Sequence, residues 1–210
     1  PPQQNVPIVQ PGAPGTASQT VSAAKASDES RVQYTDADVQ FMQGMIHHHA
    51  QALDMVDLLN QNTSTPEMLQ LGKRIYISQT DEIGMMQRWL RARGKDVPDP
   101  RAHEMADMPG MSMDRAMMPG MLTPDEMKHL ASLKGAAFDK TFLEGMIKHH
   151  GGALTMVKDL LATPGAAQDA DIFNYAATIE ADQKAEIERM SDMLARINSP
   201  GSTPNAARRP

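Results

Sequence analysis

The sequence contains no cysteine, so neither disulfide bonds nor thiolate metal sites are possible. It also lacks a basic excess, since 20 Lys and Arg stand against 26 Asp and Glu, which argues against a nucleic-acid-binding protein. No apolar run approaches the roughly 18 residues that a membrane span needs, and no segment joins a charged start to an apolar stretch as a signal peptide does. The 210 residues allow one domain with tails or two small domains.

Aromatic residues are few, whereas methionine is abundant. There are 18 methionines against one Trp and four Phe. Methionine is flexible and specifies a core poorly, so a helical core alone rarely needs so many. The excess of methionine therefore indicates a role beyond packing.

The chain divides into a leader, a helical region and a tail. Residues 1–33 are rich in Pro, Gln, Ala, Ser and Gly and cannot bury enough apolar surface to fold, so we expect a disordered leader. Residues 34–197 show helical periodicity without convincing strand alternation, and 198–210 are expected to form a flexible tail. Long helices are predicted at 35–60, 65–93, 136–161 and 164–197, with a short helix that opens in a capping box at Thr123.

Residues 35–94 and 136–197 are two copies of one helical hairpin, joined by a Met-rich linker at 95–135. Positions from Phe41 to Val56 recur with a shift of 101, and positions from Ile75 to Leu90 recur with a shift of 104. Two similar hairpins with a long crossover predict an all-α, ferritin-like four-helix bundle.

Helix rotation assigns the three consecutive histidines to different faces. An α-helix turns about 100° per residue. With Met42 as the reference, His49 points into the core, His48 lies on the flank, and His47 faces water. The second repeat agrees, since it keeps the last two histidines and has Lys148 in place of the first.

The second helix of each repeat adds polar groups to the predicted core. These are one Gln and one Glu per repeat: Gln79, Glu82, Gln183 and Glu186. A buried polar group without a partner costs about 1–3 kcal/mol, so these side chains must pair with each other, with water or with an ion. Each Glu either hydrogen-bonds a core His and fixes helix register, or orients a His that binds metal through its other ring nitrogen.

Histidine and methionine occur together at helical spacing in both repeats. Met42, Met45 and His49 are spaced i, i+3, i+7, while Met45, His48 and His49 form a tighter patch that Met146, His149 and His150 copy. Thioether sulfur is a soft ligand that selects Cu(I), and imidazole serves Cu, Zn, Fe and Ni. A methionine stripe alone is typical of core packing, but its repeated pairing with histidine favours metal sites.

The linker carries the densest group of methionines. The candidate ligands there are His103, Met105, Met108, Met111, Met113, Met117, Met118 and Met121. Two Pro-Gly pairs interrupt the segment, so it cannot form one amphipathic helix with a buried Met face. Exposed methionines favour capture of a soft metal ion; a Met-rich surface for a protein partner and a lid over the bundle are the alternatives.

The doubled motif resembles that of the CopM-like family. It consists of Phe41-Met42-x-x-Met45-Ile46-x-His48-His49-x-x-Ala52-x-x-Met55, its copy from Phe142 to Met156, and the Gln-x-x-Glu-Ile-x-x-Met runs at 79–86 and 183–190. This is a bacterial family of ferritin-like four-helix bundles, long catalogued as a domain of unknown function. The resemblance covers about 36–197 and implies an exported protein that binds copper, and silver, through Met and His in metal tolerance. It adds Met86 to the implied ligands, whereas Leu143 replaces the first methionine of the motif in the second repeat.

The predicted function is copper binding, as Cu(I), for sequestration, buffering or tolerance, without catalytic turnover. Metal ions and a protein that exchanges copper are the expected partners, and thioethers, which survive where thiols oxidise, fit a periplasmic or secreted protein. A ferritin-like di-metal oxidase is an alternative, but it needs two Glu-x-x-His motifs and the chain has one, from Glu126 to His129. A His/Met-ligated haem protein and an interaction module that presents the methionine loop are further alternatives.

Overall fold

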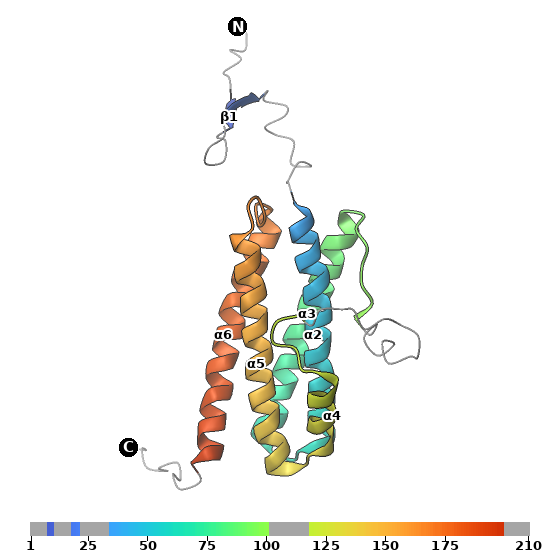
Figure 1. Cartoon of the computed structure of the whole chain (residues 1–210), viewed down its shortest axis with the longest axis vertical. Helices are drawn as coiled ribbons and strands as arrows, with labels where there is room; N and C mark the ends of the chain where they lie inside the picture. Colours follow the sequence, from blue (N-terminus) through green and yellow to red (C-terminus); the bar gives the residue numbers. More distant parts are fainter. Residues whose placement is uncertain (1–7, 11–17, 22–33, 101–117, 200–210) are drawn as a thin grey trace, which may run out of the picture.

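A computed structural model describes residues 8–10, 18–21, 34–100 and 118–199 (Figure 1). The helices of these ranges are α2 (Asp36–Asn62), α3 (Pro66–Ala92), α4 (Pro124–Ser132), α5 (Gly135–Ala162) and α6 (Ala170–Asn198). The four long helices lie side by side, and the short α4 packs against α2 and α5 near the end where α2 finishes. The predicted all-α class is confirmed. None of the helices in the described ranges is long and apolar enough to cross a membrane.

Two short strands lie within the predicted disordered leader. β1 (Ile8–Gln10) pairs antiparallel with β2 (Gln19–Val21), in a register that sets Ile8 opposite Val21. The β-branched residues of these strands favour the extended conformation. The disordered leader as a whole stays a prediction. The rest of 1–33, and residues 200–210 of the predicted tail, lie outside the described residues.

Capping residues explain where α2 and α4 begin. Thr35 and Asp38 form a capping box at α2, and Thr123 and Glu126 form the predicted one at α4. Asp38 also accepts a hydrogen bond from the backbone N–H of Ala167 at 2.7 Å. Because Ala167 lies in the turn between α5 and α6, this carboxylate ties the two hairpins together at one end of the molecule.

The last helix starts later than predicted. The sequence suggests a start at Pro164, but α6 begins at Ala170. Gly165 has φ +82° and Ala167 has φ 54°, so this stretch turns through the left-handed region and cannot continue as a helix. Asp169 then caps α6, since its carboxylate accepts hydrogen bonds from two backbone N–H groups of the first turn.

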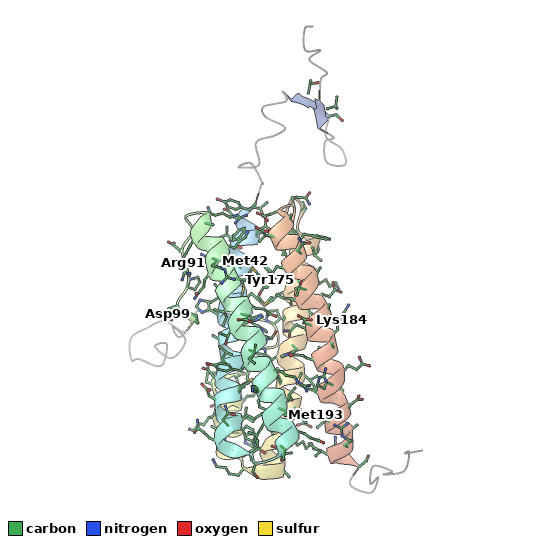
Figure 2. All side chains as sticks on the ribbon, turned by 180° about the vertical axis from the view of Figure 1, so that it is seen from behind. Met42, Arg91, Asp99, Tyr175, Lys184 and Met193 are labelled. Carbon is green, nitrogen blue, oxygen red and sulfur yellow. The ribbon has the colours of Figure 1, made fainter. Side chains whose placement is uncertain are left out.

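Two hydrophobic clusters fill the space between the long helices. One includes Met42, Trp89 and Tyr175 and lies where α2 begins and α3 ends; the other includes Phe138 and Met193 and lies at the opposite end. Figure 2 shows Met42 and Tyr175 near one end of the molecule and Met193 toward the other. All four long helices contribute to both clusters, so the two hairpins share their core.

A polar layer separates the two clusters. The break falls in the middle of each long helix: between Ile46 and Ala52 in α2, between Ile75 and Ile83 in α3, between Met146 and Ala153 in α5, and between Ile179 and Met190 in α6. These four interruptions contain the His-His and Gln-x-x-Glu motifs. The motifs that repeat along the sequence therefore meet at one level of the fold.

Candidate metal centre

Four buried histidines occupy the polar layer. They are His48 and His49 of α2 and His149 and His150 of α5, and none is more than 1% exposed. The layer is completed from α3 and α6 by Gln79, Glu82, Gln183 and Glu186. The predicted core positions of His49 and of the two glutamines are confirmed, and the two glutamates border the core as predicted.

His48 and His149, at equivalent positions of the two repeats, face each other between α2 and α5. Their ring centroids are 3.8 Å apart, and the ring planes are inclined by 38°. Burial and then the neighbouring His49 lower the pKa of His48 to about 3, and burial holds the pKa of His149 well below its usual value. Both rings are therefore neutral at pH 7, which is the form of imidazole that binds a metal ion.

The other two histidines are each held by a carboxylate. His49 Nε2 lies 2.5 Å from Glu82 Oε2, and His150 Nε2 forms the same hydrogen bond with Glu186. Because an ionised carboxylate only accepts, each of these histidines donates through Nε2–H, which leaves Nδ1 directed elsewhere. A carboxylate that fixes a histidine in this way is the usual support of a metal-binding imidazole, and here it also links neighbouring helices.

Each of the four rings keeps one buried nitrogen without a hydrogen-bond partner in the described part of the chain. These atoms are Nδ1 of His48, His49 and His150, and Nε2 of His149. A buried acceptor left unpaired costs about 1–3 kcal/mol. Each of these four ring nitrogens is therefore a candidate metal ligand.

Buried thioethers lie on both sides of the histidine layer. The first cluster contributes Met42, Met45 and Met86, and the second contributes Met146 and Met190, all of them 0% exposed. Met45 precedes His49 by one helical turn, as Met146 precedes His150. Soft sulfur donors are thus available beside the imidazoles of both repeats.

Carboxylates do not gather into a metal site of their own. Across 34–100, 118–199 and the two strands, no group of three or more His, Asp or Glu side chains is arranged to hold a metal ion. Glu82 and Glu186 are each directed to a histidine. Imidazole and thioether are thus the donors available in and beside this layer, and together they are a soft donor set.

A short part of the linker, residues 118–122, closes the layer, and we call it the strap (Figure 1). The carbonyl of Pro119 accepts a hydrogen bond from His48 Nε2, with the two atoms 3.0 Å apart. The side-chain amide of Gln51 donates to the Leu122 carbonyl at 2.9 Å and accepts from the Leu122 N–H at 2.7 Å. The strap is thereby fixed across the buried histidine pair.

Glycine on both sides allows the strap to lie against α5. A Cβ atom on Gly152 would lie 1.8 Å from the carbonyl oxygen of Pro119, and one on Gly120 would lie 2.5 Å from the carbonyl oxygen of Lys148. Gly120 also has φ +77°, a conformation that other residues rarely adopt. The Pro-Gly pair of the strap and Gly152 therefore make a backbone-to-backbone contact that no larger residue permits.

Two of the predictions for the three consecutive histidines are wrong. The helical wheel places His48 on the flank and His47 in water, but they are 0% and 7% exposed. Every residue from Met45 to Ala52 is buried, because α3, α4, α5 and the strap surround the middle of α2. The wheel assumes one buried face, and that assumption fails for a helix packed on several sides.

The predicted linker ligands are only partly described. His103, Met105, Met108, Met111, Met113 and Met117 lie outside the described residues. Met118 and Met121 belong to the strap and are half-buried, not exposed as predicted, because the strap packs against α2 and α5. For all candidate ligands, the role in metal binding stays a prediction.

Two residues that hold the strap, Gln51 and Gly152, are not among the residues predicted from the sequence. They occupy equivalent positions of the two repeats and differ completely in size and polarity. Gln51 binds the strap backbone through its amide, whereas Gly152 makes room for the backbone. The difference between Gln and Gly at equivalent positions of a close repeat is the sequence signal that could have identified them.

Solved structures of other proteins share this fold. A fragment from Deinococcus radiodurans is 29% identical with a TM-score of 0.65, covering 78% of this chain and 98% of that one. A candidate secreted protein from Streptomyces coelicolor is 28% identical with a TM-score of 0.63, covering 77% and 94%. CopM in its Cu(II)-bound form is 28% identical with a TM-score of 0.58, covering 76% and 96%. Its Cu(I)-bound and Ag-bound structures are 26% and 25% identical, with TM-scores of 0.56 and 0.54.

The family assignment agrees with these structures. No curated protein matches the chain. The family model described as a domain of unknown function, DUF305, matches residues 38–202, which run from the first turn of α2 past the end of α6. The structures from Streptomyces and Deinococcus carry the same family description, and the resemblance to CopM inferred from the doubled motif is confirmed. The chain belongs to the DUF305 family.

Proposed function

We propose that this protein binds Cu(I), and Ag(I) at the same sites, outside the cytoplasm, and that it sequesters or buffers the metal without catalytic turnover. The observation that carries the proposal is the buried layer of four neutral or carboxylate-held histidines, each with one unpartnered ring nitrogen. Methionine sulfur lies next to this layer in both hydrophobic clusters. Such a combination of donors favours a soft monovalent cation over Zn²⁺, Mg²⁺ or Ca²⁺.

The related structures support the choice of metal. CopM has been solved with Cu(I), with Cu(II) and with Ag, and it shares the fold along most of its length. Ag(I) and Cu(I) have the same charge and a similar preference for thioether ligands. We therefore expect the two ions to compete for this protein.

A location outside the cytoplasm is supported by the donor chemistry. The chain has no cysteine, and its soft ligands are thioethers, which need no deprotonation and do not form disulfides in an oxidising compartment. The Streptomyces relative is described as a candidate secreted protein. Fractionation of the native host, with detection of the protein in the extracytoplasmic fraction, tests this part of the proposal.

Anaerobic titration with Cu(I) against a competing chelator tests the binding. Three variants separate the sites: deletion of 103–117, which removes the linker methionines but keeps the strap; His149→Leu, which removes an unpartnered ring nitrogen; and His129→Leu at an exposed position as the control. We expect the intact protein to take up Cu(I) in competition with the chelator. The deletion and the His149 variant should each lose a distinct share of the bound metal, and the control should lose none.

Two further measurements sharpen the result. Zn(II) and Fe(II), titrated in the same way, should bind more weakly than Cu(I), because they prefer harder ligands. Circular dichroism of each variant confirms that the helices are retained. If the intact protein leaves Cu(I) with the chelator, or if both test variants match the control, the proposed function is refuted and the layer is only a structural network.

A further inference from the structure

The strap places one side chain over a glycine of each repeat. A Cβ atom on Gly44 would lie 3.3 Å from Met118 Sδ and 3.5 Å from Met156 Cε. The equivalent Gly145 has a similar environment, in which a Cβ would lie 3.3 Å from Leu122 Cδ2. Each glycine thus leaves a small depression on the surface of its helix, which we call a seat. The strap places Met118 in the seat at Gly44 and Leu122 in the seat at Gly145.

The second side chain of each seat comes from the opposite repeat. Met156 of α5 reaches the seat at Gly44, and Met55 of α2 reaches the seat at Gly145, where a Cβ on the glycine would lie 3.3 Å from Met55 Cε. Met55 and Met156 are themselves equivalent, since they differ by the repeat shift of 101. Each seat therefore consists of a glycine, a methionine from the opposite repeat and a side chain from the strap. The residue that the strap supplies differs between the two seats.

The two seats differ in exposure as well as in chemistry. Met118 and Met156 are both half-buried, so solvent reaches the seat at Gly44. In contrast, Leu122 is 5% exposed and Met55 is 0% exposed, so the seat at Gly145 is closed. Of the two seats, the first alone offers two thioethers at the surface of the bundle.

The geometry of the first seat suits a soft cation. Met118 Sδ and the methyl group of Met156 lie within 3.5 Å of one point, so they are at most about 7 Å apart. Methionine side chains are unbranched and flexible, so small torsional changes bring both sulfurs onto one ion. Gly44 directly precedes the fully buried Met45 and lies one turn before His48, so the seat adjoins the buried donors.

We propose that Met118 and Met156 form the site at which Cu(I) or Ag(I) is first bound by the bundle, and that this site serves the first repeat alone because Leu122 occupies the equivalent seat. The inference rests on the proposed function and deepens it by naming the route to the buried layer. The second repeat then receives metal only through the first. Of the two ligands, Met118 comes from the strap and Met156 comes from α5.

Methyl NMR of the full chain, labelled at the methionine methyl groups, shows where the ion binds first. The probe is Ag(I), which has no redox chemistry under these conditions, added below one equivalent. We expect the Met118 and Met156 methyl signals to shift at the lowest Ag(I) concentration, before those of Met146 and Met190. If the methyl signals of Met146 or Met190 shift first or together with these two, the inference is overturned.

Transfer kinetics provide a second test with matched variants. Leucine conserves the volume of methionine, so Met118→Leu and Met156→Leu keep the packing. Met127→Leu, at a half-buried position of α4 that is not among the candidate ligands, is the control. The initial rate of Cu(I) transfer from a coloured chelator should fall at least about tenfold in both test variants, since even groups that only orient a ligand change metal affinity by that factor. It should stay at the parent value in the control.

A gain-of-function variant tests the asymmetry. Leu122→Met supplies a thioether to the second seat and should add a second rapid phase of Cu(I) transfer. Rates equal to the parent in Met118→Leu, Met156→Leu and Leu122→Met would overturn the inference while the equilibrium uptake of Cu(I) still supports the proposed function. Absence of any Cu(I) or Ag(I) uptake by the parent protein would refute both.

Discussion

Lowering the pH from 7 to 5 is expected to destabilise the metal-free protein through His48. The pKa of this ring is lowered to about 3 in the folded protein, by burial first and then by His49. An unfolded histidine has a pKa near 6.5, so between these two values the unfolded chain binds one proton more than the folded chain. The stability that His48 contributes is therefore complete above about pH 6.5 and is lost as the pH falls toward about 3.

The size of the effect follows from the shift. Each pH unit below the unfolded pKa costs about 1.36 kcal/mol, so His48 alone removes about 2 kcal/mol between pH 7 and pH 5. For a helical region of this length, that corresponds to a fall in Tm of about 4–8 °C. His149, whose pKa is also held well below its usual value by burial, acts in the same direction.

Thermal unfolding followed by circular dichroism measures this loss, with a chelator present so that no metal stabilises the fold. The variant His48→Gln should lose less stability over the same pH range, because its amide does not titrate and can still donate to the Pro119 carbonyl. His129→Gln, at an exposed position, should behave like the parent. A parent Tm that is constant between pH 7 and pH 5 would contradict the burial of a neutral His48.

Two further predictions concern the strap and the carboxylate-held histidines. Gly152→Ala places a methyl group on the Pro119 carbonyl and should lower the unfolding free energy by about 1–3 kcal/mol. Gly151→Ala, where a Cβ would meet nothing within 4 Å, should raise the unfolding free energy by up to about 1 kcal/mol. Equal changes of Tm for the two variants in thermal melts would contradict the close contact between Gly152 and Pro119. Glu82→Gln should weaken Cu(I) binding about 10–100-fold in chelator competition, since the amide orients His49 less strongly; an unchanged affinity would leave this pair a structural role only.

Much of the fold could be predicted from local signals in the sequence. Thr35 and Thr123 start helices because their side chains cap the first turn, and this chemistry lies within four residues. The start of α6 could not be predicted in the same way. Proline followed by glycine at 164–165 is compatible with a helix start, and the turn found there is held by Asp38, which lies far away in the sequence.

Those contacts of the candidate site that depend on helical periodicity could be predicted from the sequence. His49 and Glu82 fall on facing stripes of neighbouring helices, so their contact follows from the spacing of the motifs. The strap could not be predicted, because the path of a loop depends on tertiary contacts such as that between Pro119 and Gly152. The burial of His48 depends on the same contacts, and for that reason the wheel places it on the flank.

The contact between His48 and His149 also defines a local two-fold axis, because equivalent residues of the two repeats meet there. Two separate copies of one hairpin could associate about such an axis as an isologous dimer. A segment that crosses the axis can be present only once, since its symmetry mate would need the same space. Because the two hairpins are joined in one chain, a single segment, the strap, can cross the axis. The strap places Met118 against one repeat and Leu122 against the other, so the two nearly identical halves become different.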